Sequence, residues 1–210
     1  MRKESIFIWG IMILILGAVV FGVMRFSNPD SLKLSLSEPI LNTDHTTGDQ
    51  SSKAVLVEYG DYQCPACGAY YPLLKQLIAE YGDRLLFVFR NYPLPQHGNA
   101  IPAAYAAEAA AKQGKFWEMH DMLYEHQNDW ADSSSAEDMF VAYAQSLKLD
   151  ANQFKKDVDA SDVSDKVSHD LQTGTASGIS ATPTFFLNSS QIQPQSYDEF
   201  KQLIDAALNS

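Results

Sequence analysis

Apolar and polar positions divide the chain into one uninterrupted apolar run, a polar stretch and a longer part with alternating patterns. Residues 6–24 carry no charged side chain. At 1.5 Å per residue, a helix over this run approaches the roughly 30 Å of hydrocarbon in a bilayer. Residues 25–53 are rich in Ser, Thr, Asn and Asp, which is typical of a linker. We therefore expect a short cytoplasmic tail over 1–5, a transmembrane anchor over 6–24, a linker over 25–53 and a folded domain over 54–210.

The charges beside the apolar run predict its orientation. Arg2 and Lys3 precede the run, and this basic excess favours that end inside the cell and the rest of the chain outside. The alternative is a cleaved signal peptide, whose apolar region usually spans about 7–15 residues and ends in a small-x-small site. Residues 20–22 (Val-Phe-Gly) make a poor cleavage site. The expectation is an uncleaved anchor and a single-pass membrane localisation with an extracytoplasmic domain.

The domain begins with a strand–helix–strand pattern. Residues 54–59 and 85–90 are short, apolar and rich in β-branched and aromatic side chains, as buried strands are. Between them, apolar residues recur at helical spacing over 66–81, with Gly82 as a C-terminal stop. Pro72 predicts a bend inside this helix. The order predicts a right-handed βαβ unit with parallel strands.

A helical part follows, and then strand character returns. Residues 99–178 carry several amphipathic patterns, of which 100–113 is rich in alanine. Residues 184–187 predict a further strand, with a short one near Ile192, and 197–208 predict a last amphipathic helix. The expected fold class is α/β, with a βαβ…ββα frame that a helical segment of about 99–178 interrupts. A short strand is also expected around 32–36, where polarity alternates.

The net charge narrows the function classes. The 210 residues carry a net charge of −11, and all of it lies on residues 54–210, because the first 53 residues hold five basic and five acidic side chains. A basic stripe that would bind phosphate groups is missing from this sequence. We therefore expect no nucleic-acid partner.

The two cysteines stand three apart, as Cys64-Pro65-Ala66-Cys67. A structural disulfide would close a very small loop and gain little stability. A zinc site needs about two further ligands, and the five histidines are scattered. Buried inert thiols suit a reducing cytosol rather than an exported domain. A redox-active dithiol is therefore expected, with no metal and no cofactor besides the Cys64–Cys67 disulfide.

The position of the pair explains how it would react. Cys64 lies where the first strand and its loop become a helix, so unpaired N–H groups and the helix dipole would stabilise its thiolate. Pro65 suits the first helical turn because its missing N–H costs nothing there. We expect Cys64 to be exposed and nucleophilic. Cys67, one turn on, should be more buried and should resolve the mixed disulfide on Cys64.

Three further residues have competing interpretations. Glu58 interrupts a strand that should be covered on both faces, and a buried carboxylate has a raised pKa. It is either an edge residue with a polar neighbour or the proton acceptor of Cys67. Pro183 precedes an apolar strand, and only about 5–6% of such bonds in folded proteins are cis. His97, in the loop 92–99, is either an exposed loop residue or a proton shuttle.

Three motifs together resemble the DsbA-like branch of the thioredoxin superfamily, bacterial extracytoplasmic thiol:disulfide oxidoreductases. They are residues 55–67 (Val-Leu-Val-Glu-Tyr-Gly-Asp-Tyr-Gln-Cys-Pro-Ala-Cys), 116–120 (Phe-Trp-Glu-Met-His) and 178–186 (Gly-Ile-Ser-Ala-Thr-Pro-Thr-Phe-Phe). The resemblance covers about residues 54–208. It implies a thioredoxin fold with an inserted helical subdomain. The apolar run over 6–24 predicts one N-terminal transmembrane helix before this domain, and we expect it to anchor the chain in the inner membrane.

The resemblance also implies roles for single residues. Cys64 takes the place of the nucleophile and Cys67 that of the resolving cysteine. Glu58 falls at the buried acidic position, and Pro183 matches a cis-proline that faces the dithiol. Thr182 would offer backbone hydrogen bonds to a bound peptide, beside Pro65 and Ala66 of the motif, which we also place at the substrate.

The sequence departs from the family at Ala66. The strongest oxidants of the family carry histidine between the cysteines, so we expect a less oxidising dithiol here. The expected activity is disulfide formation or exchange in exported proteins, by a monomer that a membrane redox partner recycles. An isomerase or reductase of the same fold, a thiol-transferase acting on small molecules, and a peptide-binding or chaperone module with an incidental cysteine pair remain as alternatives.

Overall fold

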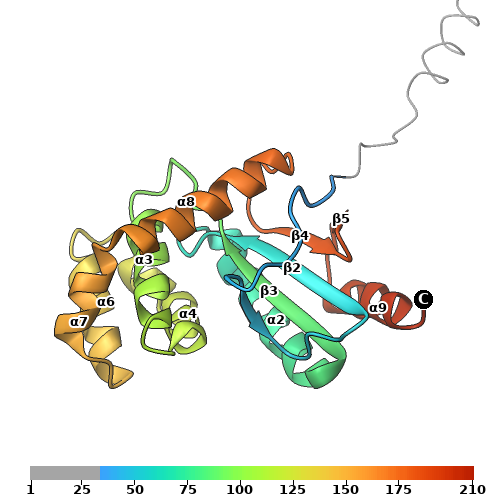
Figure 1. The fold of residues 1–210 in the computed structure, drawn as a ribbon, viewed down its shortest axis with the longest axis horizontal. Coiled ribbons are helices and arrows are strands. Elements are labelled where there is room, and N and C mark those ends of the chain that lie inside the picture. Colours follow the sequence, from blue (N-terminus) through green and yellow to red (C-terminus); the bar gives the residue numbers. More distant parts are fainter. Residues whose placement is uncertain (1–33) are drawn as a thin grey trace, which may run out of the picture. The chain divides into compact units, whose positions relative to one another are not determined.

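The computed structural model describes residues 34–210, and its centre is a five-stranded sheet (Figure 1). The strand order is β1-β3-β2-β4-β5. β2 (Ala54–Gly60) and β3 (Leu85–Asn91) are parallel, and helix α2 (Pro65–Tyr81) connects them, with a short 3₁₀ turn η1 (Gly82–Arg84) before β3. β4 (Thr184–Leu187) pairs antiparallel with β2, and β5 (Ser190–Ile192) with β4. The predicted βαβ unit and the returning strands are confirmed.

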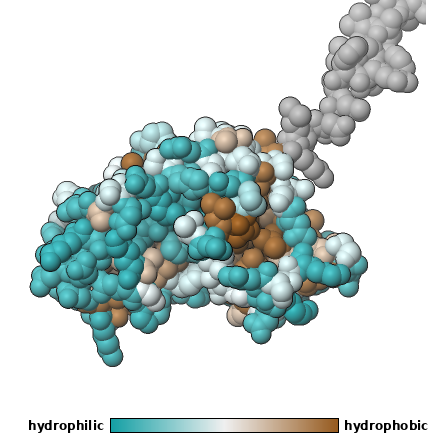
Figure 2. Space-filling model, in the orientation of Figure 1, coloured by the Kyte–Doolittle hydropathy of each residue, from teal (hydrophilic) through white to brown (hydrophobic). Residues whose placement is uncertain are grey.

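The helical insertion lies between β3 and β4, as predicted. It consists of α3 (Ala100–Ala111), α4 (Phe116–Glu125), α5 (Gln127–Trp130), α6 (Ala136–Ser146), α7 (Ala151–Val158) and α8 (Ser161–Ala176). The final helix, α9 (Tyr197–Leu208), packs on β2 and β4 at the other end of the sheet (Figure 1). The surface of the insertion is largely hydrophilic, whereas apolar side chains gather over the strands in the middle of the same view (Figure 2).

The sheet is covered on both faces, and each face has its own core. Alternation along β2 sends Leu56 towards α2, α4 and α9, where it joins Cys67 and Phe89 in the larger cluster. Val57 and Tyr59 point to the opposite face, into a smaller cluster over which the segment before β2 passes. Burial on both faces accounts for the nearly continuous apolar sequence of β2 and β3.

Part of the predicted linker belongs to the folded domain. Within 25–53, the described residues from 34 onward contribute β1 (His45–Thr47), which pairs antiparallel with β3. The strand expected around 32–36 is a single bridge between Ser35 and Ser190. β1 has no apolar pattern, and specific side-chain contacts hold it in place instead. The ring of His45 stacks on that of Phe116, with 3.5 Å between the ring centroids, and the Nε2 of His45 lies 2.7 Å from a carboxylate oxygen of Glu108.

A buried ion pair fastens the same segment to the sheet. The guanidinium of Arg90 on β3 donates to both carboxylate oxygens of Asp44, at 3.1 and 2.7 Å, and to the carbonyl of Pro39 at 2.7 Å. Only 1% of the Arg90 side chain and 3% of the Asp44 side chain are exposed. Because the charges lie away from water, the segment before β2 is required to neutralise Arg90.

The predicted membrane localisation has to be corrected. No helix within residues 34–210 is long and apolar enough to cross a bilayer. The predicted tail over 1–5 and the predicted anchor over 6–24 lie outside the described residues.

Candidate active site

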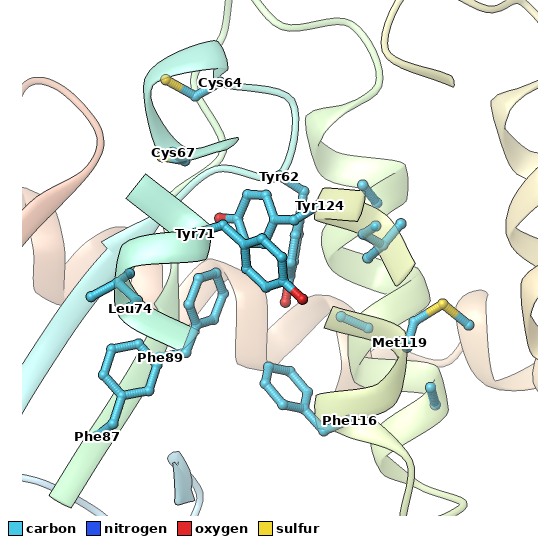
Figure 3. Packing of buried hydrophobic residues seen from close by; sticks show 14 of the residues in the cluster. Tyr62, Cys64, Cys67, Tyr71, Leu74, Phe87, Phe89, Phe116, Met119 and Tyr124 are labelled. Carbon is cyan, nitrogen blue, oxygen red and sulfur yellow. The ribbon is translucent and has the colours of Figure 1, made fainter. Parts of the chain in front are cut away.

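Cys64 lies at the N-terminal end of α2, where the sequence places it. Its backbone is extended (φ −68°, ψ 121°), and Pro65 occupies the first helical position. The Cys64 N–H donates to the Asp61 carbonyl at 3.1 Å, and the Cys64 carbonyl accepts from the N–H of Gly68 at 3.1 Å. Figure 3 shows Cys64 and Cys67 on this first turn, above a group of aromatic rings. The strand-to-helix junction thereby holds the Cys64 sulfur over free helix N–H groups.

The surroundings of Cys64 stabilise its thiolate. A hydrogen bond with Cys67 is the main cause that lowers the pKa of Cys64, to about 5, against an opposing effect of burial. Smaller contributions come from Thr182 and from the backbone of Cys67 and Ala66. Cys64 is more buried than predicted, with 6% of its surface exposed, whereas Pro65 and Ala66 are exposed.

Cys67 has the opposite character. It is completely buried, and burial is the main cause that raises its pKa well above the ordinary value, with the neighbouring Cys64 and Glu58 adding to the effect. Its sulfur accepts a long hydrogen bond from the N–H of Asp61, at 3.5 Å. Both cysteines are free thiols, so the structure describes the reduced dithiol.

Glu58 is a buried carboxyl on the same side of the sheet as the dithiol. Alternation along β2 directs it to the face that carries Leu56, and Phe89 and Phe185 stand at its paired positions on β3 and β4. Burial is the main cause that raises the pKa of Glu58 from 4.5 to about 8, and the negative charge of Cys64 adds to it. The interpretation as an exposed edge residue is wrong, because Glu58 is 1% exposed.

The loop before β4 reaches the nucleophilic cysteine. The Thr182–Pro183 peptide bond is cis, as the family resemblance implied, and the Cys64 thiol donates to the Thr182 carbonyl at 3.4 Å. A cavity of about 280 Å³ opens beside this loop. Its walls include Tyr70 from α2, Ala181 and Pro183 from the loop, and Gln191 and Ile192 from β5.

His97 has a partner that the sequence did not reveal. Its Nδ1 lies 2.6 Å from a carboxylate oxygen of Asp61, and the same oxygen accepts from the N–H of Leu94 at 2.9 Å. The other carboxylate oxygen accepts from the N–H of Gln63 at 2.8 Å. Asp61 therefore joins the loop before the dithiol to the loop that contains His97, and His97 is part of this junction.

The helical insertion also contacts the dithiol loop, through residues that sequence reasoning missed. Gln127 at the start of α5 donates from Nε2 to the carbonyls of Tyr62 and Cys64, at 2.6 and 3.0 Å. A Cβ on Gly68 would lie 2.5 Å from Oε1 of Gln127, so a larger residue there would force the Gln127 amide to move. A glycine inside a predicted helix was the one available signal, and it does not identify its distant partner.

The comparisons with known proteins agree with this geometry. A family described as Thioredoxin matches residues 41–206. BdbD from Bacillus subtilis, in its oxidised form, is similar in structure with a TM-score of 0.73 and 27% identity, over 85% of this chain and 100% of that protein. α-DsbA1 from Wolbachia pipientis shares the fold with a TM-score of 0.72 at 19% identity, over 81% of this chain and 93% of its own.

The similar curated sequences are much longer proteins. A protein named Na(+)/H(+) antiporter NhaA 1 from a Mycobacterium species (strain KMS) is 40% identical over 168 residues, which are 77% of this chain and 26% of that protein. A protein named Na(+)/H(+) antiporter NhaA from Herminiimonas arsenicoxydans is 37% identical, over 74% of this chain and 24% of its own length. The chain thus spans about a quarter of these relatives. Because the match covers only about a quarter of these proteins, their names do not support the predicted membrane localisation of this chain.

The fold, with its helical insertion, is shared with BdbD over 85% of this chain. The chain belongs to the thioredoxin family, whose match covers more than half of its residues.

Proposed function

We propose that this chain forms or exchanges disulfides in protein substrates through Cys64 and Cys67. The observation that carries the proposal is the contrast between the two thiols on one helical turn. The pKa of Cys64 is lowered to about 5, while burial raises the pKa of Cys67 far above its usual range. A thiolate is the reacting form in thiol–disulfide exchange, and a low thiol pKa makes a good leaving group. Cys64 is therefore the sulfur that bonds to substrate.

In the oxidising direction, the reaction starts from the Cys64–Cys67 disulfide. A substrate thiolate attacks the Cys64 sulfur, and Cys67 leaves and takes up the proton of the Glu58 carboxyl. A second substrate thiolate then attacks the substrate sulfur of the mixed disulfide, and Cys64 leaves as a thiolate. The substrate dithiol loses two electrons and the enzyme dithiol gains them. A redox partner with an oxidising group must then accept these electrons to restore the disulfide.

The proposed direction follows from the same contrast. A stabilised Cys64 thiolate favours the reduced enzyme, and a dithiol whose reduced form is stabilised is an oxidant. Substrate oxidation is therefore proposed as the main direction, with reduction or isomerisation as the reverse use of the same steps. Ala66 adds no positive charge to the thiolate, so the potential should be less oxidising than that of relatives with histidine there.

The substrate would lie against the exposed part of the dithiol and the loop before β4. Pro65 and Ala66 are exposed beside Cys64, and the cavity beside Pro183 is large enough for one or two side chains. Thr182 is in contact with Cys64 and is therefore proposed to contact the peptide next to the reacting sulfur.

The test is turnover with a reduced, unfolded protein that needs one disulfide for activity, in a glutathione buffer. We expect the wild-type chain to accelerate recovery of activity, and Cys64→Ser to lose all acceleration. A peptide-binding or chaperone role would survive this substitution. If Cys64→Ser supports recovery as well as the wild type does, the proposed function is wrong. If the wild type accelerates only the rearrangement of wrong disulfides, isomerisation replaces oxidation as its direction.

A further inference from the structure

Several buried polar atoms beneath the dithiol have no hydrogen-bond partner within residues 34–210. They are Glu58 Oε1, Tyr62 Oη, Tyr124 Oη and His120 Nε2. Leaving such an atom unpaired costs about 1–3 kcal/mol, so native cores rarely keep several of them together. The tyrosines and the histidine belong to one aromatic group, in which the rings of Tyr62 and Tyr124 are 5.0 Å apart. A cluster of this kind beside a reactive pair suggests a role in its chemistry.

Among these groups, the hydroxyl of Tyr124 is the one that faces the reacting side. A Cβ on Gly60 would lie 3.0 Å from Tyr124 Oη, so the hydroxyl rests on the strand at Gly60. Gly60 is two residues beyond Glu58 and therefore on the same face of β2. Figure 3 shows Tyr124 extending from α4 with its oxygen towards Cys67, whereas the oxygens of Tyr62 and Tyr71 point away from it.

Few groups that titrate face Glu58. The loop before α2 and the helix itself bring Tyr62, Cys64 and Cys67 near it, and α4 brings Tyr124. The paired positions on β3 and β4 are phenylalanines, and α9 adds apolar side chains to the same core. Burial raises the pKa of Tyr124 well above 10, so its phenol keeps its proton and stays a donor at any pH near neutrality.

We propose that the Tyr124 hydroxyl, supplied by the helical insertion, donates a hydrogen bond to a water that bridges it to the Glu58 carboxylate, and so sets the pH at which Glu58 accepts the proton of Cys67. The inference rests on the proposed function. In the resolving step, the Cys67 sulfur attacks Cys64 in a mixed disulfide, the substrate leaves as a thiolate, and the Cys67 proton passes to Glu58. Tyr124 is a positioning residue, because it acts on the sulfur through Glu58.

The test compares Tyr124→Phe with Tyr71→Phe. Tyr71 is a matched control, because its ring stacks on that of Tyr124 at 5.3 Å while its hydroxyl donates to Glu125 at 2.9 Å, away from Glu58. The rate of substrate release from a preformed mixed disulfide on Cys64 is measured across a pH range on both sides of 8. Losing a donor to a carboxylate raises its pKa, so we expect the midpoint of Tyr124→Phe to move up by about one pH unit.

Below the midpoint, that shift corresponds to about tenfold slower release. Tyr71→Phe should keep the wild-type midpoint. A second variant, fluorotyrosine at position 124, keeps the ring and strengthens the donor, so its midpoint should move down. In a Glu58→Gln background, Tyr124→Phe should have no further effect, as expected when one residue acts through the other.

The outcomes separate the two proposals. If the wild type forms no mixed disulfide at Cys64, the proposed function fails and the inference fails with it. If release proceeds but Tyr124→Phe and Tyr71→Phe have the same midpoint, only the inference is overturned. A Tyr124→Phe rate that is lower by the same factor at every pH would also overturn it, because a purely structural loss has that signature.

Discussion

At the scale of single residues, one helical turn separates a thiol that ionises easily from one that does not. The cause is local for Cys64, whose partners are Cys67, Thr182 and nearby backbone groups. For Cys67 and Glu58 the main cause is burial in the core between α2 and the sheet. The sequence predicted both cysteines from their spacing and their place at a helix start. The strand pattern left Glu58 undecided, because alternation alone does not tell how deeply a strand is covered, and only the family resemblance placed it at a buried acidic position.

Replacing Glu58 should change the pH dependence of stability. Its pKa is 4.5 when exposed and about 8 in the folded protein, so the folded state keeps a proton that the unfolded state loses in this range. The stability that the protonated Glu58 carboxyl contributes to the folded state is therefore complete below pH 4.5 and is lost as pH rises through about 8. We expect Glu58→Gln to gain stability over the reduced wild type, by up to several kcal/mol above that pH and little in acid.

Urea unfolding of both proteins in reductant at several pH values measures this difference. The gap between the two curves should open as pH rises. Parallel curves would show that the folded-state pKa of Glu58 is not raised.

At the scale of the elements, the pattern of apolar residues predicted β2, α2, β3 and the last helix, because each of them has its own apolar period. It could not predict the contact of α5 with α2. Gln127 is 65 positions from Tyr62 and 63 positions from Cys64, the two residues whose carbonyls it binds, and no local sequence pattern indicates these contacts. The same holds for Asp61 and His97, which are 36 positions apart. Such contacts arise from tertiary packing, which a periodic pattern does not encode.

Substituting Gly68 tests the contact between α2 and α5. Glycine inside a helix costs about 0.5–1 kcal/mol relative to alanine. In the wild type, Gly68→Ala should nevertheless destabilise, because the new Cβ displaces Gln127 and breaks its bonds to Tyr62 and Cys64. Each of these bonds contributes about 0.5–1.5 kcal/mol. In a Gln127→Ala background the clash is gone, so Gly68→Ala should stabilise by up to about 1 kcal/mol.

Thermal unfolding of the four proteins measures this change of sign. The same effect of Gly68→Ala in both backgrounds would mean that Gln127 does not hold the first turn of α2.

At the scale of the whole molecule, the folded unit is larger than the apolar pattern indicated. The chain between residues 34 and 53 supplies β1, the carboxylate that neutralises Arg90, and part of the cover over the second face of the sheet. Its polar composition is typical of a linker. Ion pairs and a three-residue strand hold this segment to the domain, and neither produces a periodic pattern of apolar residues in the sequence. An arginine near the end of a buried strand was the one visible sign that an acidic partner had to come from elsewhere.

Asp44→Ala tests whether this segment is structural. It leaves the Arg90 guanidinium buried without its carboxylate, and breaking a buried pair in this way costs about 3–5 kcal/mol. For a domain of this size, the Tm should fall by roughly 10 °C. Asp49→Ala is the matched control in the same segment, because its exposed carboxylate meets only Ser51, and its Tm should stay nearly unchanged. Equal Tm values for the two variants would contradict a structural role for this segment.

The central claim is that Cys64 is a thiolate near neutral pH while Cys67 is a buried thiol. The most direct test is alkylation of the reduced, folded protein with iodoacetamide at a series of pH values, with the modified cysteine identified by mass spectrometry. The account predicts that Cys64 reacts alone, with a midpoint at a pH of about 5. A midpoint at about 8.5, where an ordinary thiol ionises, or equal modification of Cys67, would contradict it.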